Sequence, residues 1–382
     1  MTSLRNPVRP LATLRVTFGL SRDYERRTGG YVYDVRLCRE FVRLGHEVDW
    51  QWLPSGFPQP DRLACEATER YLATLPDGAI FMTDQLVSSA LPDVIARHAR
   101  RLRIVQIVHH PLALEHGTAE DLALARAADE RRALRHASLV ICTSTMTAEL
   151  LERDYAVSRP RLLVAPPGTT PAPPAKGGPG PLVDLLAVGA VVPRKGHDRL
   201  VEALGLLAGR PWRLRIVGNL TRAPAHVQVV RDLIARHEIQ DRVELLGELD
   251  EPALADAWSV TDLFVSASHL EGHGMALAEA EAHGLPILAT AAGAPARWLD
   301  PEAALVVATS SPACLAPALA ALIDDPERRL RMRAAAIRSS LCRPGWQDCA
   351  RAVEAALHAM QPALAAHTQP SVQSLHGATG SS

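Results

Sequence analysis

The chain alternates short apolar runs with helical segments, and this alternation sets the strongest limit on its fold. The runs at 14–20 and 47–52 are predicted strands, and between them lie a polar loop and a helix expected over 31–44. A strand that returns to its sheet through a helix runs parallel to the strand before it. The pattern therefore predicts an α/β fold built on parallel sheet.

The alternation continues along the rest of the chain. Further strands are expected over 79–82, 102–108, 139–144, 162–166, 182–189, 213–218, 243–246, 263–266, 287–289 and 305–307. Helices are expected over 89–101, 119–136, 146–155, 225–237, 251–258, 312–323, 326–339 and 347–360, with two more that begin near 197 and 275. Strands and helices that alternate in this way are typical of doubly wound sheets.

A segment rich in proline and glycine divides this pattern into two halves. Residues 168–181 (GTTPAPPAKGGPGP) have almost no side chain that could join a core, so they are predicted to form an interdomain linker. We expect domains at 1–167 and 182–345, a last helix at 346–360 and a disordered polar tail at 361–382. The total of 382 residues is enough for two cores, with a cleft between them.

Composition excludes several classes of protein. With 47% hydrophobic residues, 22% charged residues and a formal net charge of −1, the chain is typical of a soluble globular protein and has no overall charge that favours nucleic acid. No apolar run reaches the length of roughly 18 residues that a membrane span needs, and we expect a cytoplasmic protein. The six cysteines lack metal-ligand spacing and are predicted to be buried thiols in a reducing compartment.

One local cluster of positive charge lies at 97–103. It comprises Arg97, His98, Arg100, Arg101 and Arg103. An ordinary solvated face and a weak peripheral contact with an anionic membrane surface both fit this cluster.

The stretch 268–290 (SHLEGHGMALAEAEAHGLPILAT) carries the densest group of candidate functional residues. Glu271 precedes a predicted helix and Glu279 lies within it. Gly272 and Gly274 allow a tight turn where the free N–H groups of the helix start collect, which makes an anion site. An ordinary helix with solvated carboxylates is the alternative.

Three other positions have similar signals. Gly29 and Gly30 stand at the start of a predicted helix, where their amides could meet a phosphate. Arg194 and Lys195 also precede a helix, and Lys195 is one of only two lysines in the sequence. His109 and His110 directly follow a predicted strand. Each has a plain structural alternative: a glycine turn without a ligand, a solvated basic turn, and a core or surface histidine.

The pattern E-G-x-G, followed by E-A-x-x-x-G-x-P, resembles the signature of the retaining glycosyltransferases of family 4. The opening G-G, helix and G-H-E-V also resemble this family. The resemblance implies the GT-B fold, with two Rossmann-like domains that face a cleft and a C-terminal helix that crosses back to the first. It also implies transfer of a sugar from a nucleotide diphosphate donor to an acceptor, without a metal or a further cofactor.

The resemblance assigns roles to the candidate residues. Its predicted diphosphate contacts are Arg194, Lys195, Gly29, Gly30, Gly274, Met275 and Ala276. Glu279 would bind the ribose and Glu271 the hydroxyls of the transferred sugar. His109, with His110 as second choice, would contact that sugar from the first domain. Catalysis would rest on His109, Glu271, Arg194 and Lys195.

Three positions depart from the family pattern. His273 stands where an aromatic residue is common, Ala276 replaces a proline, and the acid after G-x-P is Ala296. A sugar-nucleotide epimerase with the same fold and a non-catalytic nucleotide-sugar binder therefore stay open as alternatives. The donor, the acceptor and the oligomeric state are not predicted.

Overall fold

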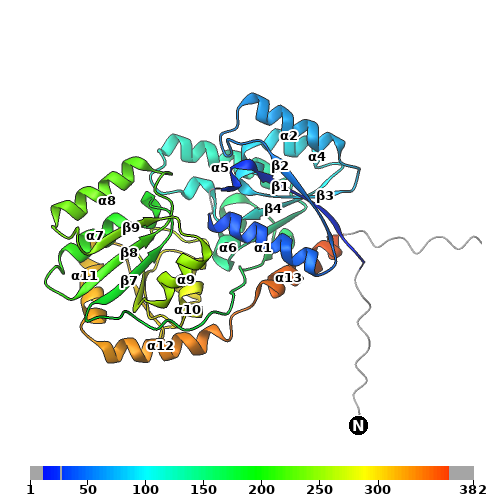
Figure 1. The fold of residues 1–382 in the computed structure, drawn as a ribbon. Coiled ribbons are helices and arrows are strands. Elements are labelled where there is room, and N and C mark those ends of the chain that lie inside the picture. Colours follow the sequence, from blue (N-terminus) through cyan, green and yellow to red (C-terminus); the bar gives the residue numbers. More distant parts are fainter. Residues whose placement is uncertain (1–11, 26–27, 361–382) are drawn as a thin grey trace, which may run out of the picture.

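Two parallel sheets of six strands carry the chain, one in each half of the sequence (Figure 1). The computed structural model describes residues 12–25 and 28–360. Every neighbouring pair of strands in the two sheets is parallel. The predicted α/β architecture with two doubly wound parallel sheets is confirmed.

The first sheet has the strand order β2-β1-β3-β4-β5-β6. Its strands are β1 (Arg15–Ser21), β2 (Glu47–Leu53), β3 (Ile80–Asp84), β4 (Arg103–Val108), β5 (Leu139–Cys142) and β6 (Leu162–Val164). The helices of this domain are α1 (Gly29–Arg43), α2 (Arg62–Thr74), α3 (Gln85–Ala90), α4 (Pro92–His98), α5 (Glu120–Leu134) and α6 (Thr145–Tyr155). Three short 3-10 turns are η1 (Arg22–Glu25), η2 (Leu112–Leu114) and η3 (Arg159–Arg161).

The second sheet has the order β12-β11-β10-β7-β8-β9. Its strands are β7 (Val183–Val188), β8 (Trp212–Val217), β9 (Val243–Gly247), β10 (Leu263–Ser266), β11 (Ile287–Thr290) and β12 (Ala304–Val307). The helices that follow are α7 (His197–Gly205), α8 (Pro224–Arg236), α9 (Glu251–Ser259), α10 (Met275–Ala282), α11 (Pro312–Ile323), α12 (Pro326–Ser340) and α13 (Trp346–Met360). The 3-10 turns are η4 (Pro193–Lys195) and η5 (Ala294–Arg297).

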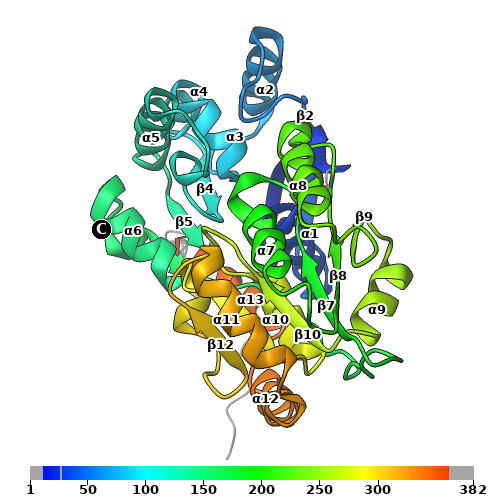
Figure 2. The same cartoon turned by 90° about the vertical axis from the view of Figure 1, so that its left-hand side faces the viewer.

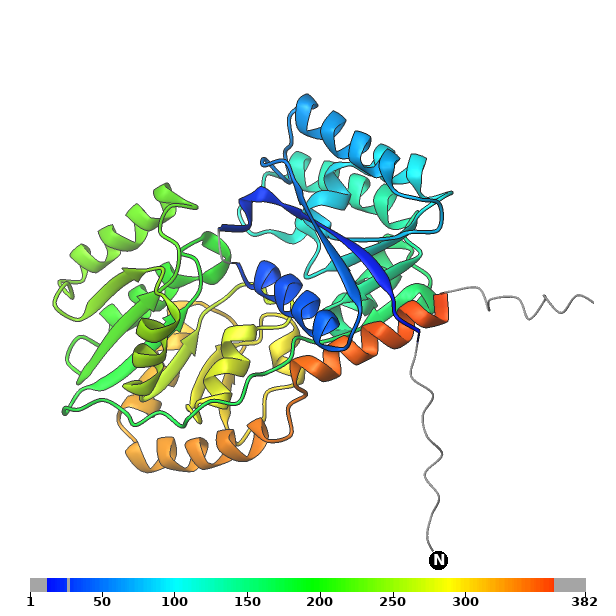
Figure 3. The same cartoon turned by 45° about the vertical axis from the view of Figure 1, so that its right-hand side comes forward.

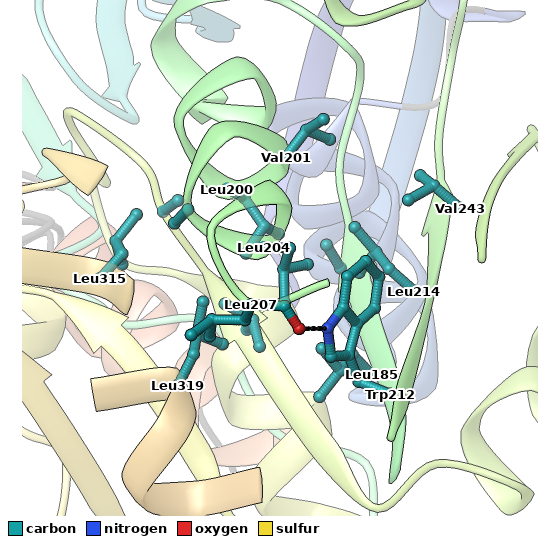
Figure 4. Close-up of a cluster of buried hydrophobic side chains, with 14 of the residues drawn as sticks. Leu185, Leu200, Val201, Leu204, Leu207, Trp212, Leu214, Val243, Leu315 and Leu319 are labelled. Atoms are coloured by element: carbon teal, nitrogen blue, oxygen red, sulfur yellow. Dashed lines mark hydrogen bonds between the residues drawn. The ribbon is translucent and has the colours of Figure 1, made fainter. Parts of the chain in front are cut away.

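Helices cover both faces of the second sheet. In Figure 2 the sheet lies between α7 and α8 on one side and α9 on the other. The core under α7, α8 and α11 is built around Trp212, which is fully buried (Figure 4). Its indole Nε1 donates to the carbonyl oxygen of Leu207 at 2.8 Å, and the Arg242 guanidinium lies 4.2 Å from the ring centroid. A large ring with its polar atom paired gives this domain a stable core.

The last helix returns to the first domain. Figure 3 shows α13, in orange-red, beside the domain that the N-terminal half of the chain forms. Val353 and Leu357 of α13 are buried in the same core as Phe41 of α1, and His46 Nε2 lies 3.0 Å from Glu354 Oε1. The predicted crossover helix is confirmed. Its apolar face completes the core of the first domain.

The two segments that connect the domains lie side by side. The amide of Thr169 donates to the carbonyl oxygen of Pro344 at 2.9 Å, and a Cβ on Gly168 would lie 2.1 Å from the Trp346 nitrogen. Residues 168–181 contain no helix or strand, and the amide of Ala175 donates to the second domain at His283 O. The exact domain boundaries stay a prediction.

Some sequence predictions differ from the structure. The single helix expected over 89–101 is two helices, α3 and α4, because Pro92 has no N–H to continue the first and instead begins the second. Helix α2 was not predicted. The expectation that all cysteines are buried is wrong for Cys342, which is exposed, and for Cys65 and Cys314, which are partly exposed.

The basic cluster at 97–103 is largely used within the first domain. Arg97 makes two hydrogen bonds to Glu69, at 2.6 and 2.8 Å, and Arg101 donates to the Leu75 carbonyl oxygen at 2.6 Å. Arg100 and Arg103 make no ion pair within the described part of the chain. Membrane contact by this cluster stays a prediction. The predicted disordered tail, 361–382, lies outside the described residues, among which no helix is long and apolar enough to cross a membrane.

Candidate functional site

The candidate residues gather where the strand order of each sheet reverses. In the second sheet this switch point lies between β7 and β10, and in the first between β1 and β3. Ligands of open α/β sheets bind outside the carboxyl ends of the strands at such points. The loops after β7 and β10 carry Arg194, Lys195 and Glu271, whereas His109 follows β4 and Gly30 follows β1.

Arg194 and Lys195 occupy the turn η4 at the start of α7. The turn ends at Gly196, whose φ of +64° favours glycine, and a Cβ there would lie 2.1 Å from the Ala267 carbonyl oxygen. Glycine thus lets this loop pack against the segment that follows β10. Two cations are held beside a helix start, where the free amides add positive potential.

Glu271 lies between these cations and is nearly buried. Its Oε1 accepts hydrogen bonds from Lys195 Nζ and from Ser268 Oγ, both at 2.6 Å, and its Oε2 lies 3.9 Å from Arg194 Nη1. Burial alone would raise the pKa of Glu271, but the Lys195 and Arg194 charges outweigh it and hold the pKa at about 2. Glu271 is therefore an ionised carboxylate with fixed orientation.

Arg194 also connects the two domains. Its Nη1 donates to the Leu270 carbonyl oxygen at 2.8 Å, and its Nε donates to Glu115 Oε1 of the first domain at 3.1 Å. The other oxygen of Glu115 lies 2.9 Å from His110 Nε2. Burial would raise the pKa of Glu115, yet His110 and Arg194 lower it to about 2. Glu115 was not predicted from the sequence.

A second contact between the domains lies next to this one. The rings of His116 and His269 stack with centroids 4.2 Å apart and an interplanar angle of 9°. Gly272 lies so close to the first domain that a Cβ there would be 2.0 Å from the His109 carbonyl oxygen. The glutamate loop is thus packed directly against the end of β4.

Gly29 and Gly30 form the start of α1, as predicted, with Thr28 Oγ1 accepting from the Tyr31 amide. A Cβ on Gly29 would lie 3.8 Å from Met275 Sδ, and one on Gly30 would lie 2.9 Å from His109 Cδ2. The absence of side chains lets the starts of α1 and α10 approach each other. Two helix N-termini therefore meet at the cleft.

The start of α10 contains the remaining predicted residues. Gly274, with φ of +90°, precedes the helix, and Met275 and Ala276 are its first residues. Glu279 follows one turn later. Burial, only partly offset by the Arg36 charge, raises its pKa to about 7.

His273 explains one departure from the family pattern. Its ring stacks on Trp298 at 5.3 Å, and Trp298 Nε1 donates to the His273 carbonyl oxygen at 2.9 Å. The imidazole thus fills the place of a flat aromatic side chain and anchors the loop between Glu271 and Gly274.

His109 and His110 point to different partners. His109 Nε2 lies 3.3 Å from Asp34 Oδ1 within the first domain, whereas His110 contacts Glu115. Burial would lower the pKa of His109, but Asp34 raises it above its ordinary value. Asp34 was not predicted from the sequence, although an acid on the apolar face of a helix is a recognisable signal.

Two family models match most of the chain between them. The model described as glycosyltransferase family 4 matches residues 28–172, and that of glycosyl transferases group 1 matches residues 175–339. The chain is also similar to the D-inositol 3-phosphate glycosyltransferase of Kineococcus radiotolerans, with 33% identity over 52% of this chain and 52% of that protein. It therefore spans about half the length of this relative.

Solved structures share the fold over nearly the whole chain. The sucrose-phosphate synthase of Thermosynechococcus elongatus has a TM-score of 0.76 and 20% identity, over 91% of this chain and 99% of that one. HepE of Anabaena, solved in complex with UDP and glucose, has a TM-score of 0.70 and 16% identity, over 90% and 99% of the two chains. At these identities the likeness concerns the fold.

Proposed function

Because the chain belongs to the family 4, group 1 glycosyltransferases, which have the GT-B fold, we propose that it transfers a sugar from a nucleotide diphosphate donor to an acceptor hydroxyl. The proposal includes retention of configuration at the anomeric carbon. The observation that carries it is the convergence of Arg194, Lys195 and Glu271 at the switch point of the second sheet, opposite His109 and Gly30.

Arg194 and Lys195 would bind the diphosphate of the donor. Lysine supplies a compact charge and arginine a planar fork, and both lie beside the start of α7. The amides at the starts of α1 and α10, at Gly30 and Met275, would add donors to the same anion. These groups stabilise the charge that grows on the diphosphate as the bond from sugar to phosphate breaks.

Two carboxylates would hold the neutral parts of the donor. Ionised Glu271 would accept hydrogen bonds from hydroxyls of the transferred sugar, and its bonds from Lys195 and Ser268 fix its direction. Glu279, on α10, would accept from the ribose hydroxyls. His109 would contact the sugar from the first domain.

Positioning supplies the rest of the mechanism. The contacts of Glu115 with Arg194 and of Gly272 with His109 bring the two domains together around the site. Closure of this kind excludes water and holds the acceptor oxygen close to the anomeric carbon. The acceptor would attack from the face that the diphosphate leaves, which retains the configuration.

We take UDP sugars as the first donors to test, because HepE, which has the same fold, was solved with UDP and glucose. The acceptor panel begins with D-inositol 3-phosphate, because the relative from Kineococcus radiotolerans carries that substrate in its name. Both choices are proposals for this chain.

Nucleotide binding is tested by thermal stabilisation with UDP, GDP, ADP and TDP on the wild type and on Lys195→Ala. A ligand at about 100 times its dissociation constant stabilises the folded state by roughly 2.7 kcal/mol. We expect one diphosphate to stabilise the wild type but not the variant. Lys176→Ala, at the exposed second lysine of the sequence, is the matched control and should respond like the wild type. If no nucleotide stabilises the wild type, the proposed function is wrong.

Product analysis separates the transferase from the two alternatives. A transferase releases diphosphate and forms a glycoside in proportion to added acceptor. An epimerase changes the donor without an acceptor, and a non-catalytic binder is stabilised by the donor but forms no product. Nuclear magnetic resonance of the anomeric proton of the product tests retention.

A further inference from the structure

Asp34 is a buried carboxyl group whose purpose the fold does not explain. It lies on α1 with no exposed surface, and neither of its oxygens has a well-aligned hydrogen bond within the described part of the chain. A carboxylate removed from water without a partner is costly. His109 Nε2 lies 3.3 Å from Asp34 Oδ1.

The backbone and ring of His109 are held in place from several sides. Its amide donates to Gln85 Oε1 at 3.2 Å, and its carbonyl oxygen accepts from Thr143 Oγ1 at 3.1 Å. The ring packs edge-on against Tyr33, with centroids 5.4 Å apart, and against the bare Cα of Gly30. The ring can therefore turn little.

The two nitrogens of His109 lie in different surroundings. Nε2 is buried and faces Asp34. Nδ1 makes no hydrogen bond to a described residue and keeps some exposed surface. The side chain is 13% exposed, which leaves Nδ1 as the nitrogen that a ligand can reach. The proton on a histidine nitrogen is set by the bond that the other nitrogen makes.

We propose that Asp34 and His109 together hold two protons at neutral pH, one shared between Oδ1 and Nε2 and the other on Nδ1. Nδ1 then donates a hydrogen bond into the cleft whichever atom of the pair holds the shared proton. This makes Asp34 a positioning residue for a hydrogen-bond donor. The inference rests on the proposed function, because there His109 contacts the transferred sugar.

The surrounding groups support this proton count. Burial raises the pKa of Asp34 above its ordinary value, and Asp34 in turn raises the pKa of His109 against the effect of burial. Asp84, at the end of β3, is the other acid near the ring; burial, followed by the Asp34 charge, raises its pKa to about 7. The other titratable groups that interact with the pair are Tyr31, Tyr33 and Cys38 on α1 and the adjacent His110. An opposite charge at such short range favours the charged form of a histidine and so raises its pKa.

Nuclear magnetic resonance of 15N-histidine protein tests the pair without a donor. His109→Gln identifies the His109 signals by their absence. We expect Nδ1 of the wild type to stay protonated at pH 7.5, and His109 of Asp34→Asn to release its first proton at a pH lower by about one unit or more than the wild-type pair does. If His109 titrates alike in both proteins, the inference is overturned, whatever the nucleotide-binding experiment shows.

Kinetics test the consequence for the site. A lost hydrogen bond to a charged group costs about tenfold to a hundredfold in rate, so kcat of Asp34→Asn should fall by that factor. The high-pH limb of its kcat/KM profile should move to lower pH, while UDP affinity stays unchanged. Asp84→Asn is the control. Its side-chain oxygen can still accept the hydrogen bond from the Val87 backbone N–H that Asp84 accepts, and it should move the high-pH limb of the profile less than Asp34→Asn does. An equal or larger shift in Asp84→Asn would count against a specific role of Asp34.

Thermal unfolding separates positioning from a structural role. If Asp34 had only a structural role in packing, its replacement would lower the unfolding temperature. Because an amide costs less to remove from water than a fully buried carboxylate, we expect Asp34→Asn to unfold at the same or a higher temperature than the wild type. A less stable variant whose kcat remains at the wild-type level would overturn the inference.

Discussion

The close approach of Gly272 to the first domain gives a direct test of domain closure. A Cβ at this position would lie 2.0 Å from the His109 carbonyl oxygen. The ordinary distance between such atoms is about 3.3 Å, so Gly272→Ala requires the domains to separate by about 1.3 Å. The oxygen cannot easily give way, because it accepts a hydrogen bond from Thr143. Gly272 has no positive φ that would strain an alanine.

A displacement of this size should cost activity more than binding. A misplacement of about 1 Å costs a reaction on the order of 100-fold, which corresponds to about 2.7 kcal/mol of activation free energy. We expect kcat/KM of Gly272→Ala to fall by about that factor. UDP affinity should change less, because both proposed cationic contacts with the diphosphate, Arg194 and Lys195 of η4, lie within the second domain, and only the Gly30 amide lies in the first.

The measurement is steady-state kinetics with titration of UDP by calorimetry. Gly209→Ala is the matched control, because a Cβ there meets no atom within 4 Å and its φ is not positive. It should behave like the wild type. If Gly272→Ala keeps kcat/KM within about threefold of the wild type, close contact at this point is not needed for the reaction.

Three further predictions concern stability. Glu115→Gln removes the carboxylate that contacts Arg194 across the cleft and should weaken the contact between the domains by about 1–2 kcal/mol. Small-angle scattering should then show a larger radius of gyration than in the wild type, and an unchanged radius would contradict this prediction. Trp212→Leu should lower the free energy of unfolding, measured in urea, by about 3 kcal/mol. Trp52→Leu should lower it less, because residue Trp52 is 40% exposed. Burial raises the pKa of Glu279 from 4.5 to about 7, so wild-type stability should fall as pH rises across that interval; a loss of the same size in Glu279→Gln would refute the assignment.

Most of the fold could be predicted because its central strands, such as β3, β5 and β11, are buried on both faces. Such strands appear as continuous apolar runs, as in Phe264 and its neighbours on β10. Helix α2 was not predicted because it buries few residues. The sequence signal for its start was the N-cap residue Asp61, whose side chain accepts a hydrogen bond from the Ala64 amide. The break between α3 and α4 was visible at Pro92, which a helix interior does not tolerate.

The site was predictable where its signals are local. Glycines at helix starts and the paired cations of η4 are properties of short segments, and the structure brings these residues together. Contacts that depend on the placement of one domain against the other, such as Glu115 with Arg194, cannot be found from local patterns. Asp34 is intermediate: it lies one turn after Gly30 on the same helix, and so on the same face.

The return of α13 to the first domain also affects how the molecule is made. The core formed by the N-terminal half of the chain includes Val353 and Leu357, which leave the ribosome only after the whole second domain. The first domain therefore keeps an apolar face uncovered throughout synthesis, whereas the second domain can complete its own core earlier. Nascent chains that end before residue 346 should expose this face to proteases and chaperones. In this molecule, the domain that is synthesised first is completed last.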